Sequence, residues 1–237
     1  MSNKDQKVVV VTGASQGIGA GIVSAYRELG YAVVATSRNI AESQDPDILT
    51  IQGDISDRAT AERVISAGVE RFGRIDSLVN NAGIFISKPF TEYTEEDYEA
   101  VLAVNVAGFF RVSQLAIAEM LKQGGGHVVQ ITTSLVEHPN SNVPAVLASL
   151  SKGGLQAVTK ALAIEYASKG IRSNAIAAGT IKTPMHAEET HEALGELHPV
   201  GRIGEISDIS DAVIYLENAP FVTGVILPVD GGQTAGH

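Results

Sequence analysis

A run of valines followed at once by three closely spaced glycines most constrains the fold of this chain. Residues 8–19 read Val-Val-Val-Val-Thr-Gly-Ala-Ser-Gln-Gly-Ile-Gly. Four consecutive β-branched residues suit a strand that is covered on both faces, as in a parallel sheet. A helical pattern that includes Ile22, Tyr26 and Leu29 opens directly behind the glycines. Strand, glycine turn and helix in this order indicate a site for a phosphate group.

Missing side chains let the backbone turn tightly and let a pyrophosphate approach peptide N–H groups. The N-terminus of the following helix adds about half a positive charge at the same place. The spacing is G-x-x-x-G-x-G, which differs from the G-x-G-x-x-G of the general dinucleotide fingerprint. The residues expected around the dinucleotide phosphates are Gly13, Ser15, Gln16, Gly17, Ile18 and Gly19.

The end of the second predicted strand, residues 31–36, bears on which dinucleotide binds. In a dinucleotide fold this strand end meets the adenosine ribose, and an acidic residue there would hold a free 2′-hydroxyl. Ser37 and Arg38 occupy the position instead, and a guanidinium suits the 2′-phosphate of NADP(H). The alternative is an arginine that is simply solvated at a strand end.

The rest of the chain alternates strands with helices. The predicted strands cover residues 48–52, 75–79, 127–132, 171–177 and 225–229, and the predicted helices cover 57–72, 96–122, 148–168 and a last helix capped by Ser207. This rhythm predicts an α/β fold of the Rossmann type: one doubly wound parallel sheet of about seven strands in a single domain, residues 1–237. Residues 183–204 lack clear periodicity and are expected to form a substrate lid.

Composition excludes several classes of function. The formal net charge is −10, whereas a binder of nucleic acid or of an anionic membrane would present a basic face. The chain has no cysteine, which removes disulfides and thiolate chemistry and fits a reducing cytoplasm. No stretch is expected to approach the ~20 apolar residues of a membrane span. We therefore expect a cytoplasmic protein without nucleic-acid or membrane partners.

Motifs along nearly the whole chain resemble those of the short-chain dehydrogenase/reductase family. They are Thr12-Gly13-Ala14-Ser15-Gln16-Gly17-Ile18-Gly19, Asn80-Asn81-Ala82-Gly83, Asn105, Ser134, Ser151-Lys152-Gly153 and Val229-Asp230-Gly231-Gly232. The resemblance implies an Asn–Ser–Tyr–Lys tetrad, in which Asn105, Ser134 and Lys152 match the asparagine, serine and lysine.

The tetrad tyrosine has no counterpart, because its position four residues before Lys152 holds Ala148. The family's tyrosine protonates the alkoxide that hydride transfer creates, and losing a positioned acid typically costs ~10²–10⁴-fold in rate. Candidate replacements are His138, a water oriented by Ser149, and Lys152 acting directly or through water. His138 is more simply explained as a solvated loop residue. A second departure from the family is Ala178-Gly179 in place of Pro-Gly.

The remaining cofactor contacts follow the order of the strands. We expect Asp54 and Ile55 at the adenine and Asn81, Ala82 and Gly83 at the adenosine and ribose side. Ile181 is a further expected cofactor contact, and the resemblance implies that Lys152 holds the nicotinamide ribose.

Two further features have simpler explanations beside the functional ones. His186, His191 and His198 lie among glutamates, but their spacing does not match H-E-x-x-H, so no metal site is expected. The helices predicted over 96–122 and 148–168 are apolar on more than one face, from central packing or from a subunit interface. The resemblance implies that they form the contacts of a homotetramer.

Two functions of different class therefore stand open. The first is an NADP(H)-dependent oxidoreductase that acts on a small carbonyl or alcohol substrate. The alternative is an NADP(H)-binding protein without redox turnover, because Ala148 occupies the tyrosine position. The presence of Asn105, Ser134 and Lys152 favours the first, since a pure binding module has no use for the serine.

Overall fold

The valine-rich first strand lies inside the sheet, as its composition predicts. In the computed structural model, which describes residues 6–186, 189 and 191–236, β1 (Val8–Thr12) pairs in parallel with β2 (Ala32–Ser37) and β4 (Ser77–Asn80). Residues 187, 188 and 190 of the expected lid lie outside this description. The side chains of Val9, Val10 and Val11 are fully buried. A strand covered on both faces is the result.

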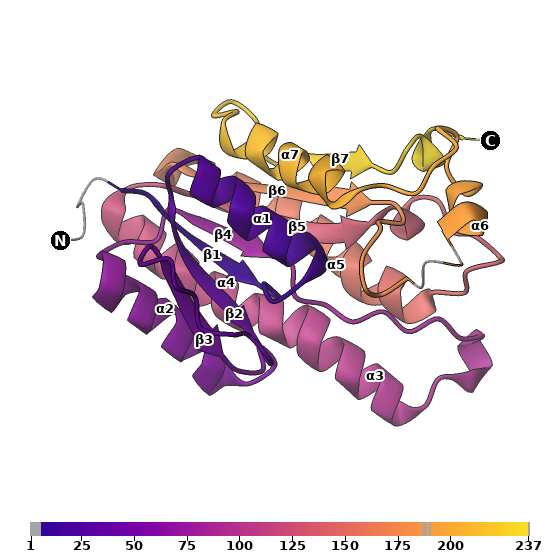
Figure 1. Cartoon of the computed structure of the whole chain (residues 1–237), viewed down its shortest axis with the longest axis horizontal. Helices are drawn as coiled ribbons and strands as arrows, with labels where there is room; N and C mark the ends of the chain where they lie inside the picture. Colours follow the sequence, from indigo (N-terminus) through magenta and orange to yellow (C-terminus); the bar gives the residue numbers. More distant parts are fainter. Residues whose placement is uncertain (1–5, 187–188, 190, 237) are drawn as a thin grey trace.

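The sheet has seven parallel strands in the order β3-β2-β1-β4-β5-β6-β7 (Figure 1). Its remaining strands are β3 (Ile48–Gln52), β5 (Gly126–Thr133), β6 (Ile171–Ala178) and β7 (Ile226–Val229). The order reverses at β1, where the next strand in sequence lies on one side and β4 on the other. Ligands of such sheets bind outside the carboxyl ends of the strands at this reversal. The predicted Rossmann-type architecture is confirmed.

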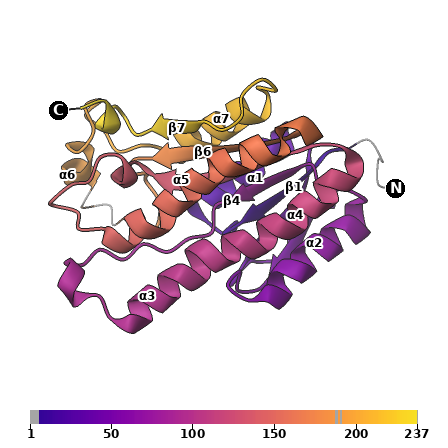
Figure 2. The ribbon, with the colours of Figure 1, turned by 180° about the vertical axis from the view of Figure 1, so that it is seen from behind.

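Helices cover both faces of the sheet. α1 (Gly17–Glu28) and α7 (Ile206–Glu217) cover one face in Figure 1, and α2 (Arg58–Phe72), α4 (Phe109–Gln123) and α5 (Val146–Tyr166) cover the other in Figure 2. Each layer has its own apolar core. Shorter elements are α3 (Glu95–Val101), α6 (His191–Gly195) and single 3₁₀ turns at Phe90–Glu92, Ser134–Val136, Ala167–Lys169 and Gln233–Ala235.

Two local predictions need correction. The helix predicted over 96–122 contains a π-helical segment, Leu102–Gly108, between α3 and α4. The predicted N-cap at Ser207 is wrong, because α7 begins one residue earlier and Glu205 is its N-cap. There the Asp208 carboxylate accepts a hydrogen bond of 2.8 Å from the Glu205 N–H. Serine is a common N-cap, but here Glu205 and Asp208 form a capping box, in which the side chain of each accepts a hydrogen bond from the backbone N–H of the other.

The continuous helical stretch Glu95–Gln123 is long and apolar enough, by length and composition alone, to cross a membrane. The expectation that no stretch approaches such a span is therefore wrong at this place. Core helices of globular proteins meet the same criterion. Val112, Ala116 and Met120 of this stretch are fully buried against the sheet.

A cluster of buried polar side chains lies at the amino ends of the central strands, opposite the carboxyl edge. Glu217, at the end of α7, accepts hydrogen bonds from Tyr26 Oη (3.0 Å), Tyr31 Oη (2.9 Å) and Ser77 Oγ (2.9 and 3.0 Å). His127 Nδ1 lies 2.8 Å from the same carboxylate. The cluster joins α1, β4, β5 and α7 through one buried acid.

Candidate active site

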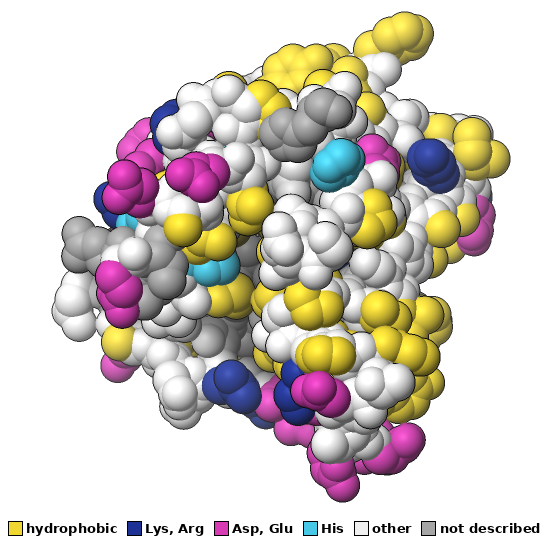
Figure 3. Space-filling model, turned by 90° about the vertical axis from the view of Figure 1, so that its right-hand side faces the viewer, with side chains coloured by type: hydrophobic (Ala, Val, Ile, Leu, Met, Phe, Trp, Pro, Cys, Tyr) yellow, Lys and Arg dark blue, Asp and Glu magenta, His cyan; other side chains and the backbone are white. Residues whose placement is uncertain are grey.

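A cleft of about 580 Å³ opens at the carboxyl ends of the strands. Figure 3 views this end of the molecule and shows that its surface is hollowed. The cleft is lined by every residue expected at the cofactor except Gly19, together with Ser134, Ala148, Lys152 and Gln233. The structure thus brings the glycine turn and two of the three expected catalytic residues to one cavity.

The glycine turn has the geometry that its sequence predicts. Gly13 and Gly17 have φ values of +67° and +57°, in the left-handed region that favours glycine. A Cβ atom at position 19 would lie 2.2 Å from Gly13 O, so only glycine fits there. Gly19 closes the turn against Gly13 instead of lining the cleft.

The N-terminus of α1 is free to hold an anion. Its N-cap residue, Gln16, makes no side-chain capping hydrogen bond, and the first turn of the helix carries no acidic residue. The first N–H groups of a helix need partners from outside it. Uncapped N–H groups beside glycine backbone fit a phosphate.

The end of β2 offers hydroxyls and a cation to the cleft. Ser15 Oγ and Ser37 Oγ lie 2.9 Å apart, and the Arg38 side chain is exposed beside them. Among the described residues, the buried Thr36 Oγ1 has no hydrogen-bond partner. Hydroxyls and a guanidinium are groups that can hold a phosphate or a ribose at this strand end.

At the end of β3, Asp54 is held in place by its own turn. Asp54 Oδ1 accepts hydrogen bonds from Ser56 N (2.9 Å) and Ser56 Oγ (2.7 Å). The hydrogen bond from the Ser56 backbone lowers the pKa of the Asp54 carboxyl, to which the nearby Arg38 charge also contributes. Ile55 follows and is nearly buried.

At the end of β4, the side-chain amide of Asn81 donates hydrogen bonds to the protein's own backbone. Its Nδ2 donates to Thr12 O (3.0 Å) and Gly13 O (3.1 Å), which fixes the glycine turn. Gly83 allows the chain to pass close to the expected catalytic groups, since a Cβ atom there would lie 3.0 Å from Lys152 Nζ. A side chain at position 83 would press on Lys152 and Asn105.

Lys152 reaches the cleft from α5. Its Nζ donates a hydrogen bond of 2.8 Å to Ile131 O, and desolvation by burial lowers the pKa of its ammonium to about 8. A lysine with this pKa changes charge within the range in which many enzymes operate. Its position suits both a ribose contact and a proton-transfer role.

Asn105 lies behind the cleft and not in its lining. Its Oδ1 accepts from Ile84 N (2.9 Å), and its Nδ2 donates to Ile84 O (3.0 Å) and Ser151 Oγ (3.1 Å). It belongs to the π-helical segment and faces a small void of about 10 Å³ that Lys152 also lines. These contacts hold the loop after β4, which is the simpler role expected for a buried amide.

Ser134 meets a partner that the sequence did not suggest. Ser134 Oγ donates a hydrogen bond of 2.8 Å to Gln233 Oε1, and both residues are buried. Gln233 follows Asp230-Gly231-Gly232 near the end of the chain. The position of Gln233 directly after that motif is the one sequence signal that could have identified it.

Ala148 lies one turn before Lys152 on α5 and lines the cleft with only 3% of its surface exposed. Ser149 does not replace a tyrosine, because its hydroxyl faces Leu135 O at 3.4 Å. Among the described residues, His138 is not part of the cleft lining, whereas His186 is. Burial, followed by the charge of His191, lowers the pKa of the His186 imidazole.

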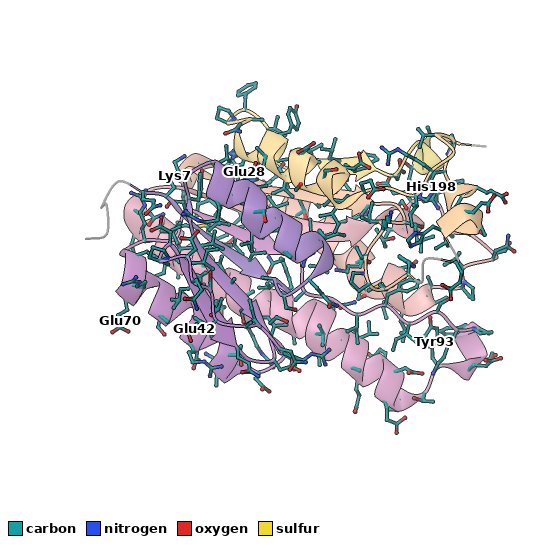
Figure 4. All side chains as sticks on the ribbon, in the orientation of Figure 1. Lys7, Glu28, Glu42, Glu70, Tyr93 and His198 are labelled. Atoms are coloured by element: carbon teal, nitrogen blue, oxygen red, sulfur yellow. The ribbon has the colours of Figure 1, made fainter. Side chains whose placement is uncertain are left out.

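His198 fixes the loop after β6 through both of its ring nitrogens. Thr180 N donates to His198 Nε2 (3.0 Å), and His198 Nδ1 donates to Leu194 O (3.0 Å), so the ring is neutral. Figure 4 labels His198 at the cleft end of the molecule, near α6. Within the described residues, no three potential ligands lie close enough to hold a metal ion, and Glu188 lies outside them.

A Cβ atom at Gly179 would come within 2.8 Å of His198 Nε2. The glycine of Ala178-Gly179 therefore makes room for the imidazole of the expected lid. This contact gives a physical reason for the glycine at that position, whatever residue precedes it.

Comparison with known proteins identifies relatives of the whole chain. A family model described as enoyl-(acyl carrier protein) reductase matches residues 13–234. The 3-oxoacyl-[acyl-carrier-protein] reductase FabG of Thermotoga maritima is 32% identical, over 95% of this chain and 97% of that protein.

Two solved structures have a TM-score of 0.90 to this chain and each covers 98% of it. ElxO with NADP bound is 29% identical and is covered in full. The 3-ketoacyl-(acyl-carrier-protein) reductase of Brucella melitensis, complexed with NADH, is 28% identical and also covered in full. Sequence and fold agree along the whole length, and the chain belongs to the short-chain dehydrogenase/reductase family of oxidoreductases.

Proposed function

We propose that the protein is an NADP(H)-dependent oxidoreductase that interconverts a small carbonyl compound and its alcohol. The observation that carries this proposal is the joint placement of Ser134, Lys152 and the uncapped N-terminus of α1 in one cleft. A hydride transfer needs a dinucleotide and a polarised substrate oxygen side by side.

The cofactor would be held along the carboxyl edge of the sheet. Backbone N–H groups of residues 15–19 bind the pyrophosphate, Arg38 binds the 2′-phosphate, and Asp54 with Ile55 flanks the adenine. Relatives with NADP and with NADH bound support a nicotinamide dinucleotide in general. Preference for NADP(H) rests on Arg38 and on the lack of an acidic residue at the end of β2.

A bound nicotinamide would supply or accept the hydride. Ser134 orients the substrate oxygen, and the Lys152 ammonium holds the ribose and stabilises negative charge that develops near it. Because Ala148 leaves room where a phenol would stand, water in that space carries the proton between Lys152 and the substrate oxygen. Asn105 holds the loop after β4 that shapes this path.

The substrate end of the cleft is formed in part by residues 183–204, which we propose as a lid. Met185, His186, Leu194 and Leu197 from this segment line the cleft, so the substrate meets a mainly apolar wall. Small apolar ketones or aldehydes fit that wall better than charged substrates.

A cofactor-binding protein without turnover remains the second candidate, favoured by Ala148 at the tyrosine position. The two candidates are separated by NADPH oxidation with a panel of ketones, aldehydes and quinones, in the parent and in Ala148→Tyr. Turnover by the parent that falls on Ser134→Ala supports the enzyme. Tight NADPH binding with a silent parent, and activity only in Ala148→Tyr, supports the binding protein.

The proposed assembly is a homotetramer. The helical stretch Glu95–Gln123 exposes Val106 and Phe110, and α5 exposes Leu150, Val158 and Ile164. These apolar side chains lie on the two helices whose sequence predicted an interface. Burial against other copies of the chain would remove them from water.

A further inference from the structure

The contact between Ser134 and Gln233 uses the serine's single hydroxyl hydrogen. Ser134 Oγ donates it to Gln233 Oε1 at 2.8 Å. A hydroxyl has one hydrogen and two lone pairs. In this state Ser134 offers only lone pairs to the cleft. It can accept a hydrogen bond from an alcohol, but it cannot donate one to a carbonyl.

A carboxamide can reverse this arrangement. If it turns over about its last bond, Nε2 occupies the place of Oε1 and donates to Ser134 Oγ, which frees the hydroxyl hydrogen for a carbonyl oxygen. We infer that Gln233 is a positioning residue that sets whether Ser134 accepts or donates a hydrogen bond toward the cleft. With Gln233 Oε1 facing it, Ser134 accepts from the alcohol; with Gln233 Nε2 facing it, Ser134 donates to the carbonyl. This inference rests on the proposed function.

The structure holds Gln233 firmly enough for such a role. The Asp230 carboxylate accepts hydrogen bonds from Gly232 N (3.0 Å) and Thr234 N (2.9 Å), on either side of Gln233. Gln233 N also donates to Asp230 O at 3.2 Å. The backbone is fixed, so the carboxamide is left with the rotation of its own side chain.

The same segment contacts the proposed lid. A Cβ atom at Gly231 would lie 2.7 Å from Val200 Cγ2, and one at Gly232 would lie 3.3 Å from Pro199 Cβ. The residues that precede Gln233 thus pack directly against lid residues. The position of Gln233, and through it the hydroxyl of Ser134, depends on this packing.

Two substitutions separate hydrogen-bond direction from simple packing. Gln233→Glu keeps the shape, but an ionised carboxylate can only accept, so it holds Ser134 as a donor toward residue 233. Gln233→Met keeps the volume and removes strong hydrogen bonding. In carbonyl reduction we expect Gln233→Glu to raise KM about tenfold, because the hydrogen bond from Ser134 to the carbonyl oxygen of the substrate is lost. Gln233→Met should cause a smaller loss.

The pH profile distinguishes positioning from structure. As pH falls, the carboxyl introduced by Gln233→Glu takes up a proton and regains a donor, so the ratio of its kcat/KM to the parent's should recover; the same ratio for Gln233→Met should show no such step. A structural defect would lower activity equally at all pH values. The matched control is Gln130→Met, which removes a carboxamide that donates to Ser173 Oγ (3.3 Å) away from the cleft. Its KM and pH profile should match the parent's.

A readout that does not depend on turnover tests the contact itself. In protein labelled with [¹⁵N]glutamine, the Gln233 carboxamide signal is assigned by its loss in Gln233→Met. Ser134→Ala should shift that signal, while the Gln130 signal stays in place. An unmoved Gln233 signal would overturn the inference even in a protein that shows no activity.

The outcomes also separate this inference from the proposed function. If Ser134→Ala leaves turnover unchanged, the proposed function fails. If Ser134→Ala abolishes turnover but Gln233→Glu keeps the parent's KM and pH profile, the proposed function stands and the role of Gln233 is refuted. A raised KM that recovers on acidification supports both.

Discussion

Ala148 and Lys152 lie one turn apart on α5 and both line the cleft, so the lysine faces the substrate region with no phenol before it. The cation that would lower a tyrosine's pKa is in place, and an alanine stands four residues before it, at the position that the family's tyrosine takes. In the proposed chemistry, the proton that reaches the substrate oxygen comes from Lys152 through water. This arrangement puts Lys152 at the centre of the proposed chemistry.

Carbonyl reduction should weaken as pH rises through about 8. Burial lowers the pKa of Lys152 to about 8, so its ammonium is charged below that pH and neutral above it. Only the charged form can donate a proton or stabilise an alkoxide. A plot of log kcat/KM against pH should bend downward near 8, and a profile that stays flat to about pH 9.5 would contradict this role for Lys152.

Arg38→Ala should weaken NADPH binding by about 10- to 100-fold and leave NADH binding nearly unchanged, because it removes a charge-assisted hydrogen bond to the 2′-phosphate. Titration of both cofactors by fluorescence or calorimetry measures this. Arg58→Ala is the control, since Arg58 pairs with Glu62 on α2 and does not line the cleft. Equal loss for both cofactors would refute the 2′-phosphate contact.

Glu217→Gln should destabilise the protein by about 2–3 kcal/mol at neutral pH, because an amide NH₂ would face groups that donate hydrogen bonds. In the parent, Glu217 Oε2 accepts from Tyr26 and His127, and Oε1 accepts from Tyr31. Chemical unfolding monitored by circular dichroism measures the difference. A change below about 0.5 kcal/mol would show that the cluster contributes little.

The same cluster makes the parent sensitive to acid. Burial lowers the pKa of the His127 imidazole in the folded protein. Below the ordinary histidine pKa of about 6.5, the unfolded chain therefore binds more protons than the folded one, and the free energy of unfolding decreases as the pH is lowered. Burial raises the pKa of the Glu217 carboxyl, but hydrogen bonds from His127, Tyr31 and Ser77 outweigh it and the net shift is downward. Its stabilisation is present above pH ~4.3 and is lost as pH falls through the folded pKa.

Phe110→Glu should break the proposed tetramer. Phe110 is 58% exposed on an apolar helix surface that includes Leu102 and Val106, and a charge there opposes burial between subunits. Light scattering should give the parent a mass near four times 24.8 kDa and the variant a smaller one. Phe90→Glu, at an exposed residue outside that surface, serves as control. A parent mass near 24.8 kDa at micromolar concentration would contradict the assembly.

Local signals in the sequence were enough for the fold. Val8–Val11 predicted a strand buried on both faces, and the spacing of Gly13, Gly17 and Gly19 predicted a turn that the backbone angles confirm. The π-helical segment Leu102–Gly108 cannot be predicted from the apolar pattern, because the spacing of apolar residues over a long helix changes little when one turn is wider. The sequence does not point to Glu205 as the N-cap, because serine is the more common cap and Ser207 lies two residues further on.

The site was only partly accessible to sequence reasoning. Ser134 and Lys152 could be placed by their motifs, and both line the cleft. Gln233 could not, because its contact with Ser134 joins residues 99 positions apart and depends on how the C-terminal turn packs. A side chain that acts across such a distance leaves no periodicity or spacing to detect.

Deuterium transfer from [4,4-²H₂]NADPH to a ketone or aldehyde, followed by mass spectrometry of the alcohol, decides whether the protein catalyses hydride transfer. The reagent is the dideuterated form, in which both C4 hydrogens are replaced, so transfer from either face of the nicotinamide is reported. We expect a product one mass unit heavier with the parent, and label transfer reduced about 100-fold or more with Ser134→Ala. Saturating NADPH binding by the parent with no labelled alcohol from any substrate would contradict the oxidoreductase function.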